Sequence, residues 1–290
     1  MVNLLEFIQK LSVLVFLLSS MFGAGLSLTL GGLAAPLSSV RLVLFALLLN
    51  FVFAPGLAWL LTVVIPLQRE HAIATFLLAG AAGAPFLPKL AESARGDMAL
   101  AVALMALLIC GTIVFMPLAL PVMIPGLEAN AWTIARPRLL LILLPLVLGM
   151  LVKRQAASFA ARLLPFLAIL SNGSLLLLFV LLIALNAPAL LGVVGSGAIL
   201  AAILYVLGLF VGTWILSASM PQARGVLALA TAARNFGAAP APAAGALADR
   251  RTNAALIVKA VVGLIVSFIA AGWLRRRAVQ LPGNSAFVVN

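Results

Sequence analysis

Charged residues are scarce in this sequence. They make up 8% of the 290 residues, against 65% hydrophobic residues and a mean hydropathy of +1.29. A soluble domain needs more polar surface than this to stay in water. Apolar runs of more than about 18 residues, long enough to cross a bilayer, recur from end to end. The sequence therefore predicts a multi-pass membrane protein in which residues 1–290 form a single polytopic domain.

Side chains that typically bind metals or perform catalysis are also few. The chain has one cysteine, Cys110, and one histidine, His71, so it can form no internal disulfide and offers no Cys/His ligand set. Cys110 lies in an apolar run, which indicates core packing, and His71 lies at a loop edge, where we expect it to be solvated. The apolar runs contain no paired carboxylates and no serine with a His or Lys at a recognisable spacing. We therefore expect no cofactor, no metal site and no enzymatic activity.

Positive charge exceeds negative charge, with a formal net charge of +12. The cations are scattered between apolar runs and form no basic aromatic face that could follow a nucleic-acid backbone. We therefore expect a lipid bilayer, and no nucleic acid, as a partner. Lys and Arg gather in the cytoplasmic loops of membrane proteins, so the same cations predict the orientation.

Hydropathy predicts an all-α membrane protein with nine transmembrane helices. The expected spans are 4–30, 38–64, 70–95, 97–123, 132–152, 160–187, 191–219, 222–249 and 253–274. With the amino terminus outside, nine cations lie inside and five outside. The inside set is Arg41, Arg95, Lys153, Arg154, Arg162, Arg224, Arg275, Arg276 and Arg277, and the outside set is Arg69, Arg136, Arg138, Arg250 and Arg251. This excess favours an amino terminus outside and a cytoplasmic carboxyl terminus.

An internal repeat relates the two halves of the chain. A shift of 155 residues without gaps aligns Trp59 with Trp214, Pro66 with Pro221, Arg69 with Arg224, Pro85 with Pro240 and Arg95 with Arg250. The shift corresponds to five spans, an odd number, so the repeats cross the membrane in opposite senses, as in secondary transporters. We predict repeat one at 1–124 with four spans, repeat two at 132–277 with five, and a tail at 278–290.

The third and eighth spans are each interrupted by prolines near a cation. The third contains Pro85, Pro88 and Lys89, and the eighth contains Arg234 before Pro240. Proline removes a backbone donor, and a broken helix at membrane depth is tolerated only where protein or a water-filled cavity surrounds it. An arginine at that depth indicates a functional site. We therefore expect two discontinuous helices that cross near Arg234.

Several stretches resemble the bile acid:sodium symporter family, including its bacterial members. They begin at Met21 (MFGAGLSL), Asn50 (NFVFAP, followed by AWLL), Ala94 (ARGDMAL), Leu144 (LPLVLG) and Arg234 (RN), in the order found in that family. The resemblance implies a transporter with a core and a panel domain and two crossing broken helices. It also implies a cell-membrane location, which we expect to be a bacterial inner membrane.

This chain departs from the family pattern at both sodium sites. Where the family has Glu-x-x-x-Gln-Asn, the chain has Ala230, Arg234 and Asn235, and the family's Pro-Gly-Gly-Thr-x-Ser-Asn appears as AGAPFLP, which ends at Pro88. The resemblance places sodium ligands at positions occupied here by Leu87, Pro88, Ala101, Met105 and Ala230. Sodium needs several oxygens to replace its hydration shell, and these side chains supply none. Asn50, which matches a family glutamine, keeps an oxygen donor.

These departures predict a sodium-independent secondary transporter of small organic anions. Arg234 and Lys89 would take the place of bound sodium by donating to carbonyls freed at the breaks. Lys259, on the last span, or Lys89 could couple transport to protons, since a desolvated lysine can discharge; a uniporter or an exchanger is equally compatible. The predicted substrate and crossover residues are Asn50, Pro85, Pro88, Lys89, Arg234, Asn235, Pro240 and Lys259.

Alternative interpretations stay open for the function and for individual residues. The chain could be a sodium-coupled symporter of bile acids or other organic anions, or a membrane protein derived from a transporter that no longer transports. Lys89 could extend to a membrane surface or pair with Glu92 one turn later. Lys259 could reach the outer headgroups, and Asn50 could simply join two helices.

Overall fold

A computed structural model describes residues 2–124, 131–193, 195, 197–236 and 250–280 of the chain. Throughout these ranges the regular secondary structure is helical, and no strand occurs in them. The helices are α1 (Val2–Ser27), α2 (Leu30–Leu37), α3 (Val40–Leu48), η1 (Leu49–Phe53), α4 (Ala54–Val64), α5 (Arg69–Gly80), α6 (Leu87–Ser93), α7 (Met98–Met123), α8 (Ala131–Arg138), η2 (Leu139–Leu143), α9 (Leu144–Gln155), α10 (Ala157–Gly192), α11 (Ala198–Leu216), α12 (Arg224–Ala232) and α14 (Arg250–Gln280).

Seven helices in the described part of the chain are long and apolar enough to cross a membrane. They cover Leu4–Ser27, Val40–Val64, Met98–Met123, Ala135–Gln155, Ala157–Pro188, Ala198–Leu216 and Ala254–Arg277. The chain is therefore an all-helical, multi-pass membrane protein. The remaining two of the nine expected spans contain the proline pairs, and the count of nine stays a prediction.

The third expected span is two helices and not one. α5 ends at Gly80, a non-helical segment follows, and α6 begins at Leu87. In the eighth expected span, α12 ends at Ala232 and the chain becomes extended at Ala233. α5 and α12 begin at Arg69 and Arg224, which are 155 residues apart and match in the predicted repeat. The boundaries of the two repeats, and the tail at 278–290, stay predictions.

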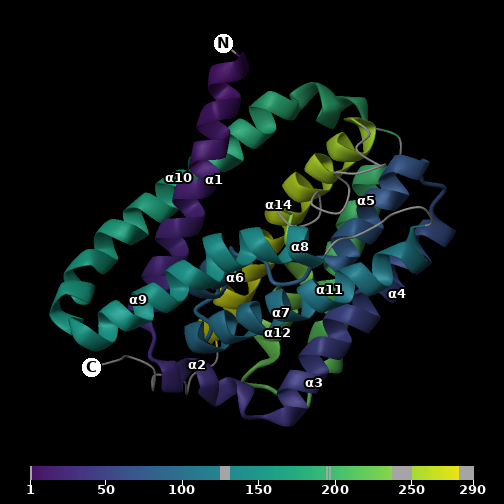
Figure 1. Cartoon of the computed structure of the whole chain (residues 1–290). Helices are drawn as coiled ribbons and strands as arrows, with labels where there is room; N and C mark the ends of the chain where they lie inside the picture. Colours follow the sequence, from purple (N-terminus) through teal and green to yellow (C-terminus); the bar gives the residue numbers. More distant parts are fainter. Residues whose placement is uncertain (1, 125–130, 194, 196, 237–249, 281–290) are drawn as a thin grey trace.

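The long helices pack in two neighbourhoods (Figure 1). α1 packs most extensively against α10 and α9, and α14 packs against α11 and α5. At Gly25 of α1 an added Cβ would lie 2.2 Å from the carbonyl oxygen of Leu146, and at Gly149 of α9 it would lie 2.3 Å from that of Phe22. Glycine at these two positions therefore lets the backbones of α1 and α9 touch. The division into a core and a panel domain stays a prediction.

Two spans contain a π-helical turn followed by a proline. η1 leads into α4, whose second residue is Pro55, and η2 leads into α9, whose second residue is Pro145. Proline lacks a backbone donor and its ring clashes with the preceding turn, so the helix widens there. In η1 this turn carries Asn50, which is fully buried.

Two side chains lie in surroundings opposite to the predicted ones. Cys110 is exposed on the outer face of α7, on one stripe with Val114 and Leu118, so the prediction of core packing was wrong. His71 is buried, because α5 packs against α14, so the prediction of a solvated residue was also wrong. In a membrane protein, lipid-facing and core positions are both apolar, so hydropathy does not distinguish them.

Candidate functional site

Arg234 joins the two broken helices. Its side chain is 1% exposed, and its guanidinium donates from Nε to the carbonyl oxygen of Leu78 at 3.0 Å and from Nη2 to that of Ala79. Both carbonyls belong to the last turn of α5, where the helix dipole is negative and carbonyl groups have no α-helical N–H donor four residues later. The guanidinium thus neutralises the end of α5 from the opposite break.

Asn50 and Thr231 complete the surroundings of the guanidinium. Arg234 Nη1 donates to Asn50 Oδ1 at 2.9 Å and to the carbonyl oxygen of Thr231 at 3.4 Å. The amide nitrogen of Asn50 donates to the carbonyl oxygen of Ala46 at 3.0 Å and lies 3.4 Å from the hydroxyl of Thr231. The Asn50 side chain therefore links η1, α12 and the guanidinium.

The segment between α5 and α6 is held by further polar contacts. The backbone N–H of Asn235 donates to the carbonyl oxygen of Ala81 at 2.8 Å, and its side-chain amide donates to that of Gly83 at 3.1 Å. Thr112 of α7 exchanges two hydrogen bonds with the backbone of Ala82, at 3.0 and 3.1 Å. Non-helical backbone at membrane depth needs such internal partners, and the contacts fix the two breaks against each other.

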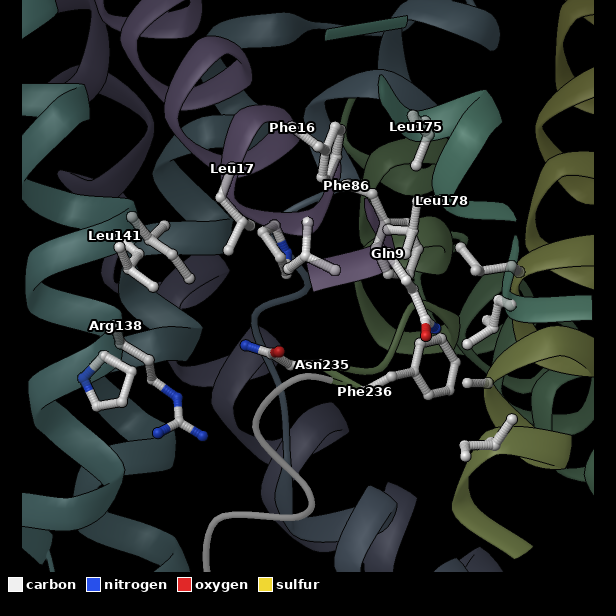
Figure 2. Close-up of a pocket in the computed structure, with 18 of the residues that line it drawn as sticks. Gln9, Phe16, Leu17, Phe86, Arg138, Leu141, Leu175, Leu178, Asn235 and Phe236 are labelled. Atoms are coloured by element: carbon white, nitrogen blue, oxygen red, sulfur yellow. The ribbon is translucent and has the colours of Figure 1, made fainter. Parts of the chain in front are cut away.

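A cavity of about 520 Å³ lies beside this crossing. It is lined by Gln9, Val13, Phe16 and Leu17 of α1, Pro85 and Phe86, Pro137 and Arg138 of α8, Leu141 and Ile142 of η2, Leu175, Leu178 and Leu182 of α10, Asn235 and Phe236, and Leu256, Ile257, Ala260 and Leu264 of α14. Figure 2 shows Asn235 and Phe236 reaching into it from the broken segment. The volume falls in the range of roughly 300–1,000 Å³ that small-molecule sites occupy.

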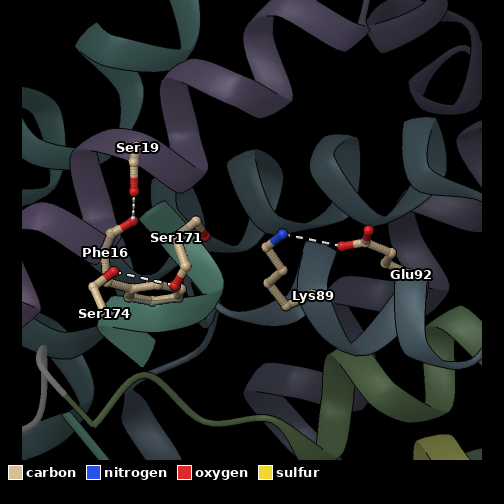
Figure 3. A network of polar contacts seen from close by, with 6 residues as sticks. All are labelled: Phe16, Ser19, Lys89, Glu92, Ser171 and Ser174. Atoms are coloured by element: carbon tan, nitrogen blue, oxygen red, sulfur yellow. Dashed lines mark hydrogen bonds and ion pairs between the residues drawn. The ribbon is translucent and has the colours of Figure 1, made fainter. Parts of the chain in front are cut away.

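Lys89 lies away from the guanidinium, at a second cavity of about 250 Å³ between α1, α6 and α10. Its ammonium is 3.1 Å from a carboxylate oxygen of Glu92, one turn later (Figure 3). Ser19, Ser20 and Ser171 also line this cavity. The ion pair is one of the alternatives that the sequence left open, and it occupies the charge of Lys89.

Lys259 lies on α14, on the side that faces α5. Its side chain is 4% exposed, and its ammonium has no hydrogen-bond partner among the described residues. Nδ1 of the buried His71 likewise has none among them. The burial of Lys259 contradicts the alternative in which its side chain reaches the outer headgroups.

The other predicted site residues have mixed outcomes. Pro85 lines the larger cavity, Pro88 lines the smaller one, and Pro240 lies outside the described residues. The positions at which the family resemblance placed sodium ligands, Leu87, Pro88, Ala101, Met105 and Ala230, are all buried. No group of three or more His, Cys, Asp or Glu side chains gathers within the described ranges.

Arg138 is the cavity residue that sequence reasoning missed. The charge count used Arg138 only as an outside cation at the start of the expected span 132–152, but its side chain is 3% exposed and lines the larger cavity. The residues that follow Arg138, 139–144, are all leucine or isoleucine, so the sequence has no pattern that marks one face. Only the structure shows that Leu141 and Ile142 line the same cavity as Arg138.

One comparison with known proteins decides the family. A model of the sodium bile acid symporter family matches residues 14–193, which is more than half of the chain. The chain belongs to this family. The match extends from α1 into the end of α10 and stops before α11 and α12. No curated protein matches the chain.

The family match confirms the resemblance to the bile acid:sodium symporter family that the sequence showed. It also confirms that the chain is a multi-pass membrane protein of a transporter family. Members of that family are transporters and not enzymes, which agrees at this level with the expectation of no enzymatic activity.

Proposed function

We propose that the protein is a sodium-independent secondary transporter of small organic anions, in which Arg234 holds the crossing segments together in place of bound sodium. The carrying observation is the buried guanidinium of Arg234, which donates to carbonyl groups of Leu78 and Ala79 at the end of α5. A sodium ion would attract such carbonyls. A covalently attached cation does the same without needing an ion from solution.

The residues at the family's sodium positions support this proposal. Sodium binds where several oxygens replace its hydration shell, and the side chains there, from Leu87, Pro88, Ala101, Met105 and Ala230, contain no oxygen. The side chains present therefore do not fit the ion. Arginine keeps its charge at every accessible pH, so the cation at the crossing would be permanent.

Arg234 alone takes the place of bound sodium in this proposal, and Lys89 does not contribute. The ammonium of Lys89 pairs with Glu92 and is not directed at the end of α5. Because both groups are on α6, this pair stabilises that short helix locally.

We propose a membrane orientation with the amino terminus outside a bacterial inner membrane, on the basis of the charge count.

The surroundings of Lys259 indicate that transport is coupled to protons. A buried ammonium without a hydrogen-bond partner among the described residues is costly, and losing a proton removes that cost. In proteoliposomes, an imposed pH gradient should therefore drive anion uptake, and Lys259→Met should remove this dependence while counterflow persists. A wild-type protein that ignores the gradient would instead be a uniporter or an exchanger.

Sodium dependence is the direct test of the proposed function. The purified protein should unfold at the same temperature in sodium chloride and in choline chloride, and counterflow of an organic anion should be equal in both salts. The double variant Ala230→Glu with Arg234→Gln restores the family pattern Glu-x-x-x-Gln-Asn and should gain stabilisation by sodium, whereas the single Arg234→Gln variant should not.

Each alternative function has its own result in this experiment. Sodium-dependent stabilisation and transport by the wild-type protein would establish the sodium-coupled symporter. Absence of counterflow across a panel of carboxylates and sulfonates, from a protein that unfolds cooperatively, would favour a membrane protein that does not transport.

A further inference from the structure

The larger cavity is apolar apart from a few polar side chains. Among the described residues that line it, the polar ones are Gln9, Arg138 and Asn235, and Arg138 carries the charge. The remaining lining is aliphatic or aromatic, with Phe16 and Phe236 among it. A site of this kind suits a ligand with a sizeable apolar body and one acidic group.

Arg138 is buried in the protein near one end of its span. It is 3% exposed, whereas Arg136, two residues earlier on α8, is exposed. Arg138 lies just inside the apolar span that begins at Ala135, where an arginine indicates a functional site. Figure 2 shows its guanidinium on the side of the cavity that also carries Leu141.

Arg234 does not line the cavity and so cannot contact an acidic group of a ligand bound there. Its guanidinium donates to carbonyls of Leu78, Ala79 and Thr231 and to the Asn50 amide, and the residue is not among those that line the cavity. The two arginines therefore differ in location. Arg234 lies at the crossing of the broken helices, and Arg138 lies at the wall of a space large enough for a small molecule.

We propose that Arg138 binds the acidic group of the transported anion and so determines that the cavity accepts monoanions. The planar guanidinium matches a carboxylate or sulfonate with two parallel hydrogen bonds. The apolar body of the ligand lies against Leu175, Leu178 and Phe236 on the rest of the wall. This assignment rests on the proposed transport function, because it names the group that recognises the substrate.

Asn235 connects this site to the crossing. Its side chain reaches into the cavity (Figure 2), and its amide nitrogen donates to the carbonyl oxygen of Gly83. A ligand held by Arg138 thus lies between α8 and the broken segments that contain Pro85 and Asn235. Such a position is what a substrate site needs if movement of α8 past the broken helices is to carry the ligand.

Three ligands with one apolar body test the assignment. The purified full chain in non-ionic detergent is titrated with 2-naphthylacetate, 2-naphthylacetamide and 2-naphthylmethylammonium, and affinity is taken from the rise in unfolding temperature. The wild-type protein should bind the carboxylate about 10- to 100-fold more tightly than the amide, as expected for a hydrogen bond to a charged group, and the ammonium most weakly.

Variants then locate the charge. Arg138→Gln should remove the preference for the carboxylate and leave the affinity for the amide unchanged. Arg138→Lys should keep a reduced preference, because lysine retains the charge and loses the planar fork. Arg136→Gln is the matched control, since it removes an equal charge from an exposed position on α8, and it should change neither affinity.

The outcomes separate this proposal from the proposed function. Retention of the carboxylate preference in Arg138→Gln, or its equal loss in Arg136→Gln, would overturn the assignment of Arg138 even if counterflow of 2-naphthylacetate persists. Loss of the preference without any counterflow in the wild type would support the binding site and contradict transport. If Arg138→Gln fails to fold, the test uses the affinities of the wild-type protein and of Arg138→Lys for the three ligands. Equal affinity of the wild-type protein for the carboxylate and the amide would then refute the proposal.

Discussion

Replacing Arg234 by methionine tests the central structural claim about the crossing. Methionine is similar in length and apolar, but it donates no hydrogen bond. The carbonyl oxygen of Leu78 keeps the N–H of Ala81 as a donor at 3.0 Å. The carbonyl oxygen of Ala79 and Oδ1 of Asn50 lose the donors that the guanidinium supplies, and the carbonyl oxygen of Thr231 loses only a long contact of 3.4 Å.

The expected loss of stability in Arg234→Met follows from the two acceptors that lose a donor, the carbonyl oxygen of Ala79 and Oδ1 of Asn50. A buried acceptor without a donor costs about 1–3 kcal/mol, so Arg234→Met should destabilise the protein by about 2–6 kcal/mol. A change of 1 kcal/mol shifts the unfolding temperature of a large domain by about 2–4 °C, so we expect a decrease on the order of 10 °C. Arg234→Gln retains one amide donor and should lose about half as much.

The assay is thermal unfolding of the purified variants in detergent, followed by static light scattering. Arg136→Gln is again the control, because that arginine is exposed and should shift the unfolding temperature by less than 2 °C, as a surface substitution contributes within about 0.5 kcal/mol.

An opposite result has a clear physical meaning. Burial of a guanidinium carries a desolvation cost, and apolar replacements of buried charges are sometimes neutral or stabilising. If Arg234→Met unfolds at the same or a higher temperature than the wild type, that cost exceeds the gain from Ala79 and Asn50. Arg234 would then not hold the crossing, and the proposed replacement of sodium would lose its basis.

Glycine substitutions test two close backbone approaches. Gly83 has φ +74° and an added Cβ would lie 2.7 Å from the backbone N of Ile109, so Gly83→Ala should lower the unfolding temperature at least as much as Arg234→Gln. Gly25→Ala should separate α1 from α9 because its Cβ would lie 2.2 Å from the carbonyl oxygen of Leu146, and it should reduce both stability and anion binding. Gly23→Ala is the matched control on α1, since its Cβ would meet nothing closer than 3.6 Å, and equal effects of the two α1 variants would contradict this account.

The sequence determined the class of the protein and the position of the break in the third span. Low charge and recurrent apolar runs require a membrane solvent, and the seven helices that can span it confirm a multi-pass protein. Pro85 and Pro88 predicted an interruption that the structure places between Gly80 and Leu87. Such features are local, because proline alters the backbone wherever it stands.

Only the tertiary structure decided which groups meet. Arg234 contacts Leu78 and Asn50, which are 156 and 184 residues away, and no local pattern specifies such partners. Tertiary packing also placed Arg138 at a cavity wall, although a charge count treats it only as a cation on the outer side. The physical reason is that lipid and protein interior are equally apolar, so the faces of a span are assigned by the helices that pack against it.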